Sequence, residues 1–156
     1  MGGNIMKITR KGEYAMRALV DLALHYKKGM RQIQDIVREE DIPEKFLEQI
    51  LLALKNAGFV ESKRGVGGGY FLSNPPDKIL LGDVIRLIDG PLAPLDCVSK
   101  TKHVKCPKEI TCGIHSVMLD VSNATAEILD HVTLADVCNR TKGMAERRAE
   151  HQMYYI

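Results

Sequence analysis

The chain has 156 residues, of which 45% are hydrophobic and 27% charged, and its formal net charge at pH 7 is +2. A chain of this length can bury one core, or one small domain with an appendage. No apolar run approaches the roughly 20 residues that a bilayer-spanning helix needs, and the N-terminus lacks the hydrophobic stretch of a signal peptide. The composition therefore argues against a membrane protein, and we expect a cytoplasmic one whose four cysteines stay reduced.

The net charge does not by itself indicate a nucleic-acid partner. The first 75 residues hold 12 Lys and Arg against 9 Asp and Glu, and the remainder holds 10 against 11. Because this excess is slight, any case for DNA binding depends on local arrangement. Residues 1–5 are expected to be an unstructured extension, since Met6 is an equally natural start.

Three segments near the N-terminus show helical periodicity. Tyr14–Tyr26 places apolar residues three and four positions apart, as in a helix with one buried face, and Gly29 ends it. A shorter periodic piece lies at Ile33–Val37. A third helix is expected from about Pro43 to Ala57, because proline fits a first helical turn and the following glycine is a typical stop. The residues expected on its inner face are Phe46, Leu47, Ile50, Leu51 and Leu54.

Two short strand-like pieces follow, at Phe59–Lys63 and Tyr70–Ser73, around a glycine-rich tip at 64–69. A phosphate-binding loop is the competing interpretation of the glycines. It fails because no Gly-Lys-Ser/Thr follows and the next element is strand-like rather than helical. Helix, short helix, turn, helix and hairpin is the order of a winged helix-turn-helix, so we predict a mainly α fold with a small β-hairpin wing.

The rest of the chain predicts further helices around a loop. Leu81–Ile88 is one helix, the loop fills roughly 91–112, and a longer helix starts near Gly113. Thr133 and Asp136 resemble a capping box that opens a last short helix. We expect a DNA-binding domain over 6–76, a loop and dimerisation-helix region over 77–142, and a flexible tail over 143–156. Five apolar residues of the long helix have the spacing of a heptad, suited to packing against a second copy or against the chain's own core: Ile114, Val117, Val121, Ala124 and Ile128.

Polar residues on the third helix and at the hairpin tip are candidates for contacting DNA. In a helix-turn-helix the outer face of this helix enters the major groove, where Gln can pair with adenine and Glu with cytosine. A solvated face without contacts is the alternative, because outward polar residues are common. At the hairpin, small residues allow close approach and Arg can enter a minor groove. The candidates are Lys45, Glu48, Gln49, Lys63 and Arg64.

Three cysteines and a histidine form the most distinctive pattern of the chain: Cys97, Cys106, Cys112 and His115, spaced C-x8-C-x5-C-x2-H. Three thiols and an imidazole make a plausible four-ligand site for an iron–sulfur cluster or zinc. The last two stand at i and i+3, so both project from one face of a helix start. A zinc site or a regulatory disulfide remains open. Cys138 stands alone in the last predicted helix and is expected to be a small buried hydrophobe.

Several stretches resemble the IscR/NsrR/CymR-type family of bacterial winged-helix transcription regulators. They are Lys7-Ile-Thr-Arg-Lys-Gly-Glu-Tyr-Ala15, Phe46-Leu-Glu-Gln49, Arg64-Gly-Val-Gly-Gly-Gly-Tyr70 and Leu81-Gly-Asp-Val-Ile85, together with the downstream cysteines. The resemblance covers about residues 6–142, and its wing motif is the most specific part. It implies a homodimer bound to double-stranded DNA at a pseudo-palindromic operator, with Glu48 and Gln49 contacting bases and Arg64 entering the minor groove.

The resemblance also bears on the cofactor. Family members with the three cysteines carry an iron–sulfur cluster, and the Cys-x2-His ending is similar to the cluster loop of the IscR-type members, which this chain resembles most. The first spacing is longer here. Other relatives take an acidic fourth ligand from the first helix, where Glu13 stands in this chain, so His115 and Glu13 are alternatives for that role. Three cysteines and one histidine favour a 2Fe–2S cluster.

Together these observations predict a transcriptional regulator controlled by an iron–sulfur cluster, and not an enzyme. The signal would be iron or cluster status, a redox change or nitric oxide. The alternative is a cluster-free winged-helix repressor controlled by a protein partner or by thiol oxidation. A redox enzyme is disfavoured because the chain has no CxxC pair and no nucleotide-binding fingerprint.

Overall fold

A computed structural model describes residues 6–155, so the predicted extension at 1–5 lies outside the described residues. Within that range the helices are α1 (Arg10–Leu24), α2 (Ile33–Glu40), α3 (Glu44–Asn56), α4 (Leu81–Asp89), α5 (Gly113–Leu129) and α6 (Leu134–Met153), and the strands are β1 (Val60–Lys63) and β2 (Gly69–Leu72). Short 3-10 turns occupy Pro76–Lys78, Asp96–Val98 and Glu109–Thr111. No helix between residues 6 and 155 is both long enough and apolar enough to cross a membrane.

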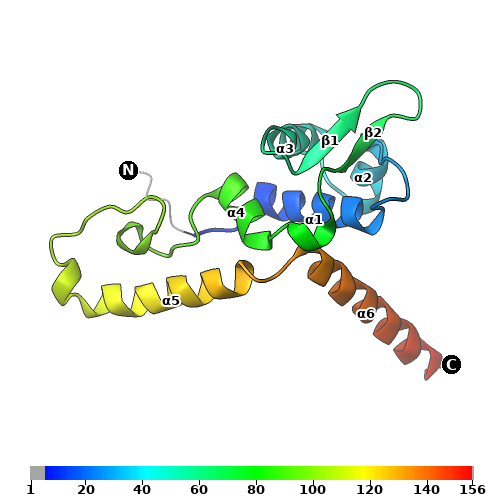
Figure 1. The fold of residues 1–156 in the computed structure, drawn as a ribbon. Helices are drawn as coiled ribbons and strands as arrows, with labels where there is room; N and C mark the ends of the chain where they lie inside the picture. The colour runs from blue at the N-terminus through cyan, green and yellow to red at the C-terminus, as the bar shows by residue number, and fades with distance from the viewer. Residues whose placement is uncertain (1–5, 156) are drawn as a thin grey trace.

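Helix α1 is the centre of the core. Its N-cap is Thr9, whose side chain accepts a hydrogen bond from the N–H of Gly12 and so satisfies one free donor of the first turn. One face of α1 is fully buried, and it packs against α3, α4 and α6 (Figure 1). The predicted periodicity of this helix is therefore confirmed, with an earlier start at Arg10.

Helices α2 and α3 form the helix-turn-helix. Asp41 ends α2 in the left-handed conformation (φ 49°), and Ile42 is buried beneath the turn. The buried face of α3 consists of Leu47, Ile50, Leu51 and Leu54, as the sequence predicts. Phe46 is an exception, and the prediction that it faces inward is wrong. It stands beside this stripe, packs edge-on against Tyr14 with ring centroids 6.1 Å apart, and remains 47% exposed.

The wing is an antiparallel hairpin in which Val60 pairs with Leu72 and Lys63 with Gly69. Gly68 has to be glycine, since a Cβ there would lie 2.2 Å from the carbonyl oxygen of Lys63. The predicted hairpin is confirmed, although β1 begins one residue later than predicted and β2 begins and ends one residue earlier.

Helix α4 connects the winged helix to α5. The Arg86 guanidinium donates to both carboxylate oxygens of Asp130, at 2.6 and 2.9 Å, next to the C-terminal end of α5. In the same C-terminal turn of α4, Asp89 accepts hydrogen bonds from the backbone N–H and the hydroxyl of Thr9. The C-terminal turn of α4 is therefore joined to the end of α5 through Asp130 and to the start of α1 through Asp89.

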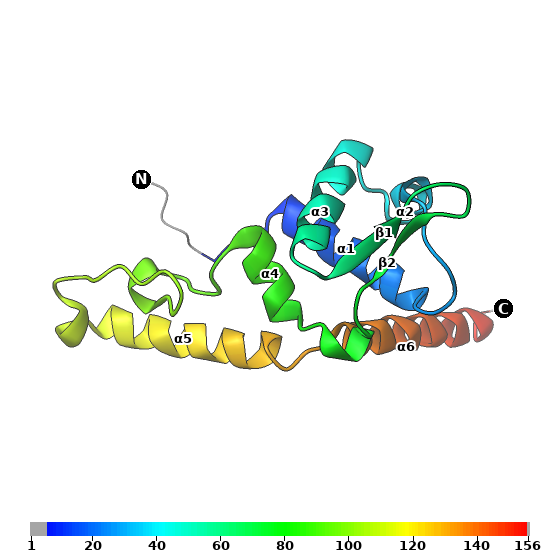
Figure 2. The same cartoon turned by 45° about the horizontal axis from the view of Figure 1, so that its top comes forward.

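Helices α5 and α6 extend in opposite directions from the winged helix (Figures 1 and 2). The segment 91–112, which we call the cysteine loop, lies alongside the N-terminal part of α5. The capping box of Thr133 and Asp136 at the start of α6 is confirmed. The prediction of a short last helix is wrong, because α6 continues to Met153 through most of the expected tail. The flexibility of residues 143–156 stays a prediction.

Candidate DNA interface and cysteine loop

The outer face of α3 presents the polar residues that the sequence singles out. Lys45, Glu48 and Gln49 are all exposed, and their spacing of three and four places them on one side of the helix. Leu52, one turn further on, is 59% exposed on the same side. An apolar side chain there is suited to contact with a thymine methyl group.

A cleft of about 280 Å³ separates α3 from the wing. Glu48 and Lys55 line it from the helix, while Lys63 and Arg64 line it from the hairpin. The Lys55 ammonium donates to the hydroxyl of Ser62 at 2.6 Å and so connects the two walls. Three cations against one carboxylate give the cleft the charge that a phosphate backbone requires. The sequence alone does not reveal the contact between Lys55 and Ser62, because only the fold brings the wing beside α3.

The wing tip projects into solvent. Lys63 and Arg64 are exposed, and Val66 between the glycines is fully exposed. Gly65 and Gly67 have φ values of 96° and 73°, which a residue with a Cβ adopts only at a cost. The turn thus presents Arg64 on a narrow, nearly side-chain-free loop that can approach a groove.

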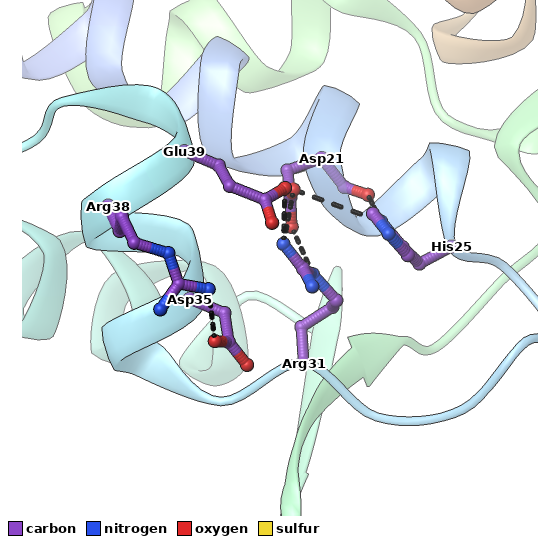
Figure 3. A network of polar contacts seen from close by, with 6 residues as sticks. All are labelled: Asp21, His25, Arg31, Asp35, Arg38 and Glu39. Atoms are coloured by element: carbon purple, nitrogen blue, oxygen red, sulfur yellow. Dashed lines mark hydrogen bonds and ion pairs between the residues drawn. The ribbon is translucent and has the colours of Figure 1, made fainter.

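A partly buried ionic network, centred on Asp21, supports the base of the wing (Figure 3). Arg31 donates to both oxygens of Asp21, at 2.9 and 3.0 Å, and to Glu39 at 2.8 Å. Asp21 is 2% exposed. His25, one turn later at the end of α1, donates a hydrogen bond from Nδ1–H to the Asp21 carbonyl at 2.8 Å. The hydrogen bond to Asp21 raises the pKa of the Arg31 guanidinium, although burial opposes it. No sequence signal pointed to this network, because its members come from α1, the following connection and α2.

The cysteine loop places its four predicted ligands unevenly. Cys112 is the N-cap of α5, and its Sγ accepts from the N–H of His115 at 3.4 Å. Cys97 lies half-buried in the turn Asp96–Val98, and Cys106 is exposed. All the described cysteines are free, and between residues 6 and 155 no three His, Cys, Asp or Glu side chains come together as a metal site. The fold therefore brings Cys112 and His115 together but does not assemble all four ligands.

Glu109 is a member of this loop that sequence reasoning missed. Its carboxylate accepts from Nε2 of His103 at 3.1 and 3.2 Å and from the N–H of Cys106 at 3.3 Å. Nε2 of His115 lies 3.9 Å away. The hydrogen bond from His103 is the main reason why the pKa of Glu109 is lowered. His103 thus helps hold the loop toward the start of α5.

The donor set of the loop fits an iron–sulfur cluster. Thiolates are the ligands such clusters need, and an imidazole can replace one of them. The Nδ1 atom of His115 is buried and has no hydrogen-bond partner among the described residues, which leaves a ring nitrogen available for coordination. Cys112 stands at the N-terminus of α5, where the positive end of the helix dipole favours the thiolate form of its side chain.

Two residues outside the cysteine loop, Glu13 and Cys138, differ in their surroundings. Glu13, the alternative ligand, lies on α1 with its carboxylate 3.8 Å from the Arg17 guanidinium, and its side chain is 47% exposed. Cys138 is 6% exposed in the core, and burial raises the pKa of its thiol. The prediction that Cys138 is a small buried hydrophobe is confirmed.

The apolar stripe of α5 faces solvent in the single chain. Ile114, Val117, Val121 and Ile128 are 67%, 56%, 44% and 63% exposed, and Ala124 is exposed with them. The alternative that this stripe belongs to the chain's own core is therefore wrong. A row of exposed apolar residues along one helix is unusual for a surface that stays in water.

These features define the class: a winged helix-turn-helix protein that binds DNA. More specifically, the chain belongs to the Rrf2 family, described as iron-dependent transcriptional regulators, whose pattern matches residues 8–140. This confirms the family that the wing motif indicates. The chain is a transcriptional regulator and not an enzyme.

Two kinds of relative are similar over nearly the whole chain. The regulator CymR of Bacillus subtilis is 33% identical over 97% of this chain and 100% of its own length, and IscR of Aliivibrio salmonicida is 35% identical over 92% and 84%. Among solved structures, CymR, described as the global cysteine regulator of B. subtilis, has a TM-score of 0.75 at 32% identity and covers 87% of this chain and 98% of its own. IscR of T. potens has a TM-score of 0.70 at 32% identity, and the match covers 87% of this chain and 88% of the IscR chain.

Proposed function

We propose that this regulator is a cytoplasmic, homodimeric sensor whose operator binding depends on an iron–sulfur cluster, most consistent with 2Fe–2S. The observation that carries the proposal is the buried Nδ1 of His115, which lies beside Cys112 and has no hydrogen-bond partner within residues 6–155. The adjoining loop holds two further free cysteines. The description of the family as iron-dependent supports the same metal.

The DNA contacts come from the cleft and its two walls. Glu48 and Gln49 contact base edges in the major groove, and Lys45 contacts phosphate or guanine. Lys63 neutralises a phosphate, and Arg64 enters the adjacent minor groove. The exposure of all five side chains and the cationic cleft between α3 and the wing support this assignment.

The homodimer forms through α5. Its exposed stripe packs against the same stripe of a second copy, which removes the apolar surface from water. Two-fold symmetry of the dimer then matches a pseudo-palindromic operator. The heptad spacing of the stripe and its solvent exposure support this interface.

Cys97, Cys106, Cys112 and His115 are the proposed ligands, and Glu13 is the alternative to His115. The cluster, when bound, would supply a charge and redox state that respond to iron supply, oxidants or nitric oxide. Holding it requires Cys97 and Cys106 to move toward the start of α5. That movement is open to this loop, because Cys106 is exposed and the loop is irregular over most of 91–112.

A change in the cysteine loop can reach the DNA-binding face through three contacts. The Ser122 hydroxyl of α5 donates to the Leu92 carbonyl at 3.2 Å, and the N–H of Met6 donates to the Ala93 carbonyl at 2.7 Å. Just before the loop, Asp89 holds the N-cap of α1. Rearranging the loop would therefore shift α5, which sets the distance between the two α3 helices of the dimer. It would also shift α1, against which α3 packs.

The test is isolation of the chain without oxygen, followed by absorption spectroscopy and iron and sulfide analysis. We expect a red-brown protein with equal iron and sulfide, and Cys112→Ser is expected to lose the colour while Cys138→Ser keeps it. Changing His115 and Glu13 separately to Ala identifies the fourth ligand. Operator footprinting with and without the metal tests the switch, and identical binding in both forms would remove it.

The second candidate is a cluster-free repressor controlled by thiol oxidation or by a protein partner. Free thiols that are not gathered into a metal site within 6–155 favour it, as does the likeness to a regulator described by its link to cysteine. A colourless protein isolated without oxygen, whose DNA affinity changes on oxidation and recovers with dithiothreitol, would establish this alternative.

A further inference from the structure

A second pocket, separate from the cysteine loop, opens beside the base of the wing. It has a volume of about 400 Å³ and lies where the end of α1, the connection to α2 and strand β2 meet. This volume is within the range of small-molecule sites in proteins. Leu22, Met30 and Leu72 contribute apolar surface to its wall.

Apart from its tyrosines, the ionisable residues that line the pocket are all basic. His25, Lys27 and Arg31 all line the pocket, and none of the described lining residues is Asp or Glu. Arg31 is already neutralised by Asp21 and Glu39. Lys27 pairs with no carboxylate among the described residues, and its ammonium lies 5.6 Å from the centroid of the Tyr26 ring. The pocket therefore offers one uncompensated cation next to an apolar wall.

The pocket is mechanically linked to the DNA-binding cleft. Tyr70 lines both cavities. Its backbone also exchanges two hydrogen bonds with Arg31, at 2.8 and 2.9 Å, on the pocket side of the hairpin. The residue before it, Gly69, pairs with Lys63 at the start of the wing tip. A molecule that displaces Arg31 or Tyr70 therefore moves the strand that carries the wing.

We propose that this pocket binds a small apolar acid, a monocarboxylate with an aromatic or branched hydrocarbon body, and that its occupancy changes the position of the wing relative to α3. The hydrocarbon body would contact the apolar wall, and the carboxylate would pair with Lys27. The binding event is independent of the proposed cluster. Only its consequence, a change in DNA affinity, rests on the proposed function.

The test uses 4-phenylbutyrate as the probe and its uncharged amide, 4-phenylbutanamide, as the matched control. Backbone amide shifts of the isotope-labelled full chain are followed by NMR during titration. We expect saturable shifts at lining residues with a dissociation constant on the order of 1 mM. The amide should bind about 5-fold more weakly, because it loses a partly exposed ion pair.

Two pairs of variants localise the site. Lys27→Gln should weaken the acid about 5-fold and bring it level with the amide, while Lys28→Gln, outside the lining, should leave it unchanged. Met30→Trp should fill the pocket and abolish the shifts, while Met144→Trp on α6 should keep them. Absence of shifts at the lining amides, or equal binding of acid and amide, would overturn the proposal.

The coupling is measured separately. A duplex selected from random sequence for binding to this chain is titrated with and without a saturating amount of 4-phenylbutyrate, and we expect about a 5-fold change in affinity. Pocket binding with unchanged DNA affinity would overturn the coupling. If no duplex is selected, the proposed function fails while the probe titration still reports on the pocket.

Discussion

Arg31 and Tyr70 exchange both of their backbone hydrogen bonds: the N–H of Arg31 donates to the Tyr70 carbonyl at 2.9 Å, and the N–H of Tyr70 donates to the Arg31 carbonyl at 2.8 Å. The connection after α1 is thereby added to the edge of β2. Because the Arg31 side chain is held by Asp21 of α1, the base of the wing is positioned by the core helix itself. The orientation of the wing, the proposed DNA-contacting loop, thus depends on the ion pair between Asp21 and Arg31.

Replacing Asp21 with Ala should lower the free energy of unfolding by about 3 kcal/mol, because it leaves the Arg31 guanidinium partly buried with Glu39 as its remaining partner. Urea unfolding followed by circular dichroism measures the change. The control is Asp35→Ala, which removes a pair with the largely exposed Arg38 and should cost less than about 1 kcal/mol. Equal losses in the two variants would contradict the role given to Asp21.

Gly12→Ala should destabilise the chain by roughly 1–3 kcal/mol. A Cβ at Gly12 would lie 2.0 Å from a carboxylate oxygen of Asp89, so the contact between α4 and the N-cap of α1 has to open. Gly143→Ala is the matched control on α6, where a Cβ meets no atom within 4 Å. There the substitution should stabilise the helix by about 0.5–1 kcal/mol. Thermal unfolding of the two variants should therefore shift in opposite directions.

The Arg86–Asp130 pair predicts acid sensitivity. Its hydrogen bond lowers the pKa of Asp130 below the ordinary value of 3.8, so the unfolded state binds the proton more tightly. The stabilisation is present above that ordinary value and is lost as the pH falls through the lower folded pKa. The difference in unfolding free energy between the wild type and Asp130→Asn should accordingly shrink below about pH 4. Asp77→Asn, at an exposed site, should show no such convergence.

Val121→Glu should convert the proposed dimer to monomer. A carboxylate in the middle of the α5 stripe would have to be buried against the second copy without a partner. Sedimentation velocity measures the assembly, and circular dichroism checks that the helices remain. Met144→Glu, at a 61% exposed position on α6, should leave the assembly state unchanged. A Val121→Glu protein that remains dimeric would move the interface elsewhere.

Lys63→Ala and Arg64→Ala should differ in how they affect DNA binding. Loss of a phosphate contact at Lys63 should reduce the slope of log affinity against log salt by about 1, uniformly across sequences. Arg64→Ala should in addition reduce the preference for a narrow minor groove next to the major-groove site. Fluorescence anisotropy at several salt concentrations measures both, with Lys142→Ala on α6 as the control. Identical slopes for Lys63→Ala and Lys142→Ala would remove Lys63 from the interface.

Much of the fold follows from local patterns. The apolar residues of α1, α3 and α4 recur three and four positions apart, and a helix is the element that gathers residues of this spacing on one buried face. The glycines at 65–69 predict the wing, because only they allow its tight turn. The same logic failed at Phe46, which is apolar but stands beside the buried stripe, and at α6, whose polar second half carries no periodic signal although its helix continues.

Sequence by itself determined the chemistry that is available: three thiols and an imidazole in one loop, cations at a glycine-rich tip, and an apolar stripe on one helix. Only the tertiary structure decided which groups meet. In the folded chain Asp21 pairs with Arg31, Glu109 bonds to His103, and Lys55 bonds to Ser62. Tyr70 lines two cavities. The physical reason is that ion pairs and cleft walls depend on the directions in which whole helices and strands pack, and those directions are set by the shared core rather than by the spacing of the residues that meet.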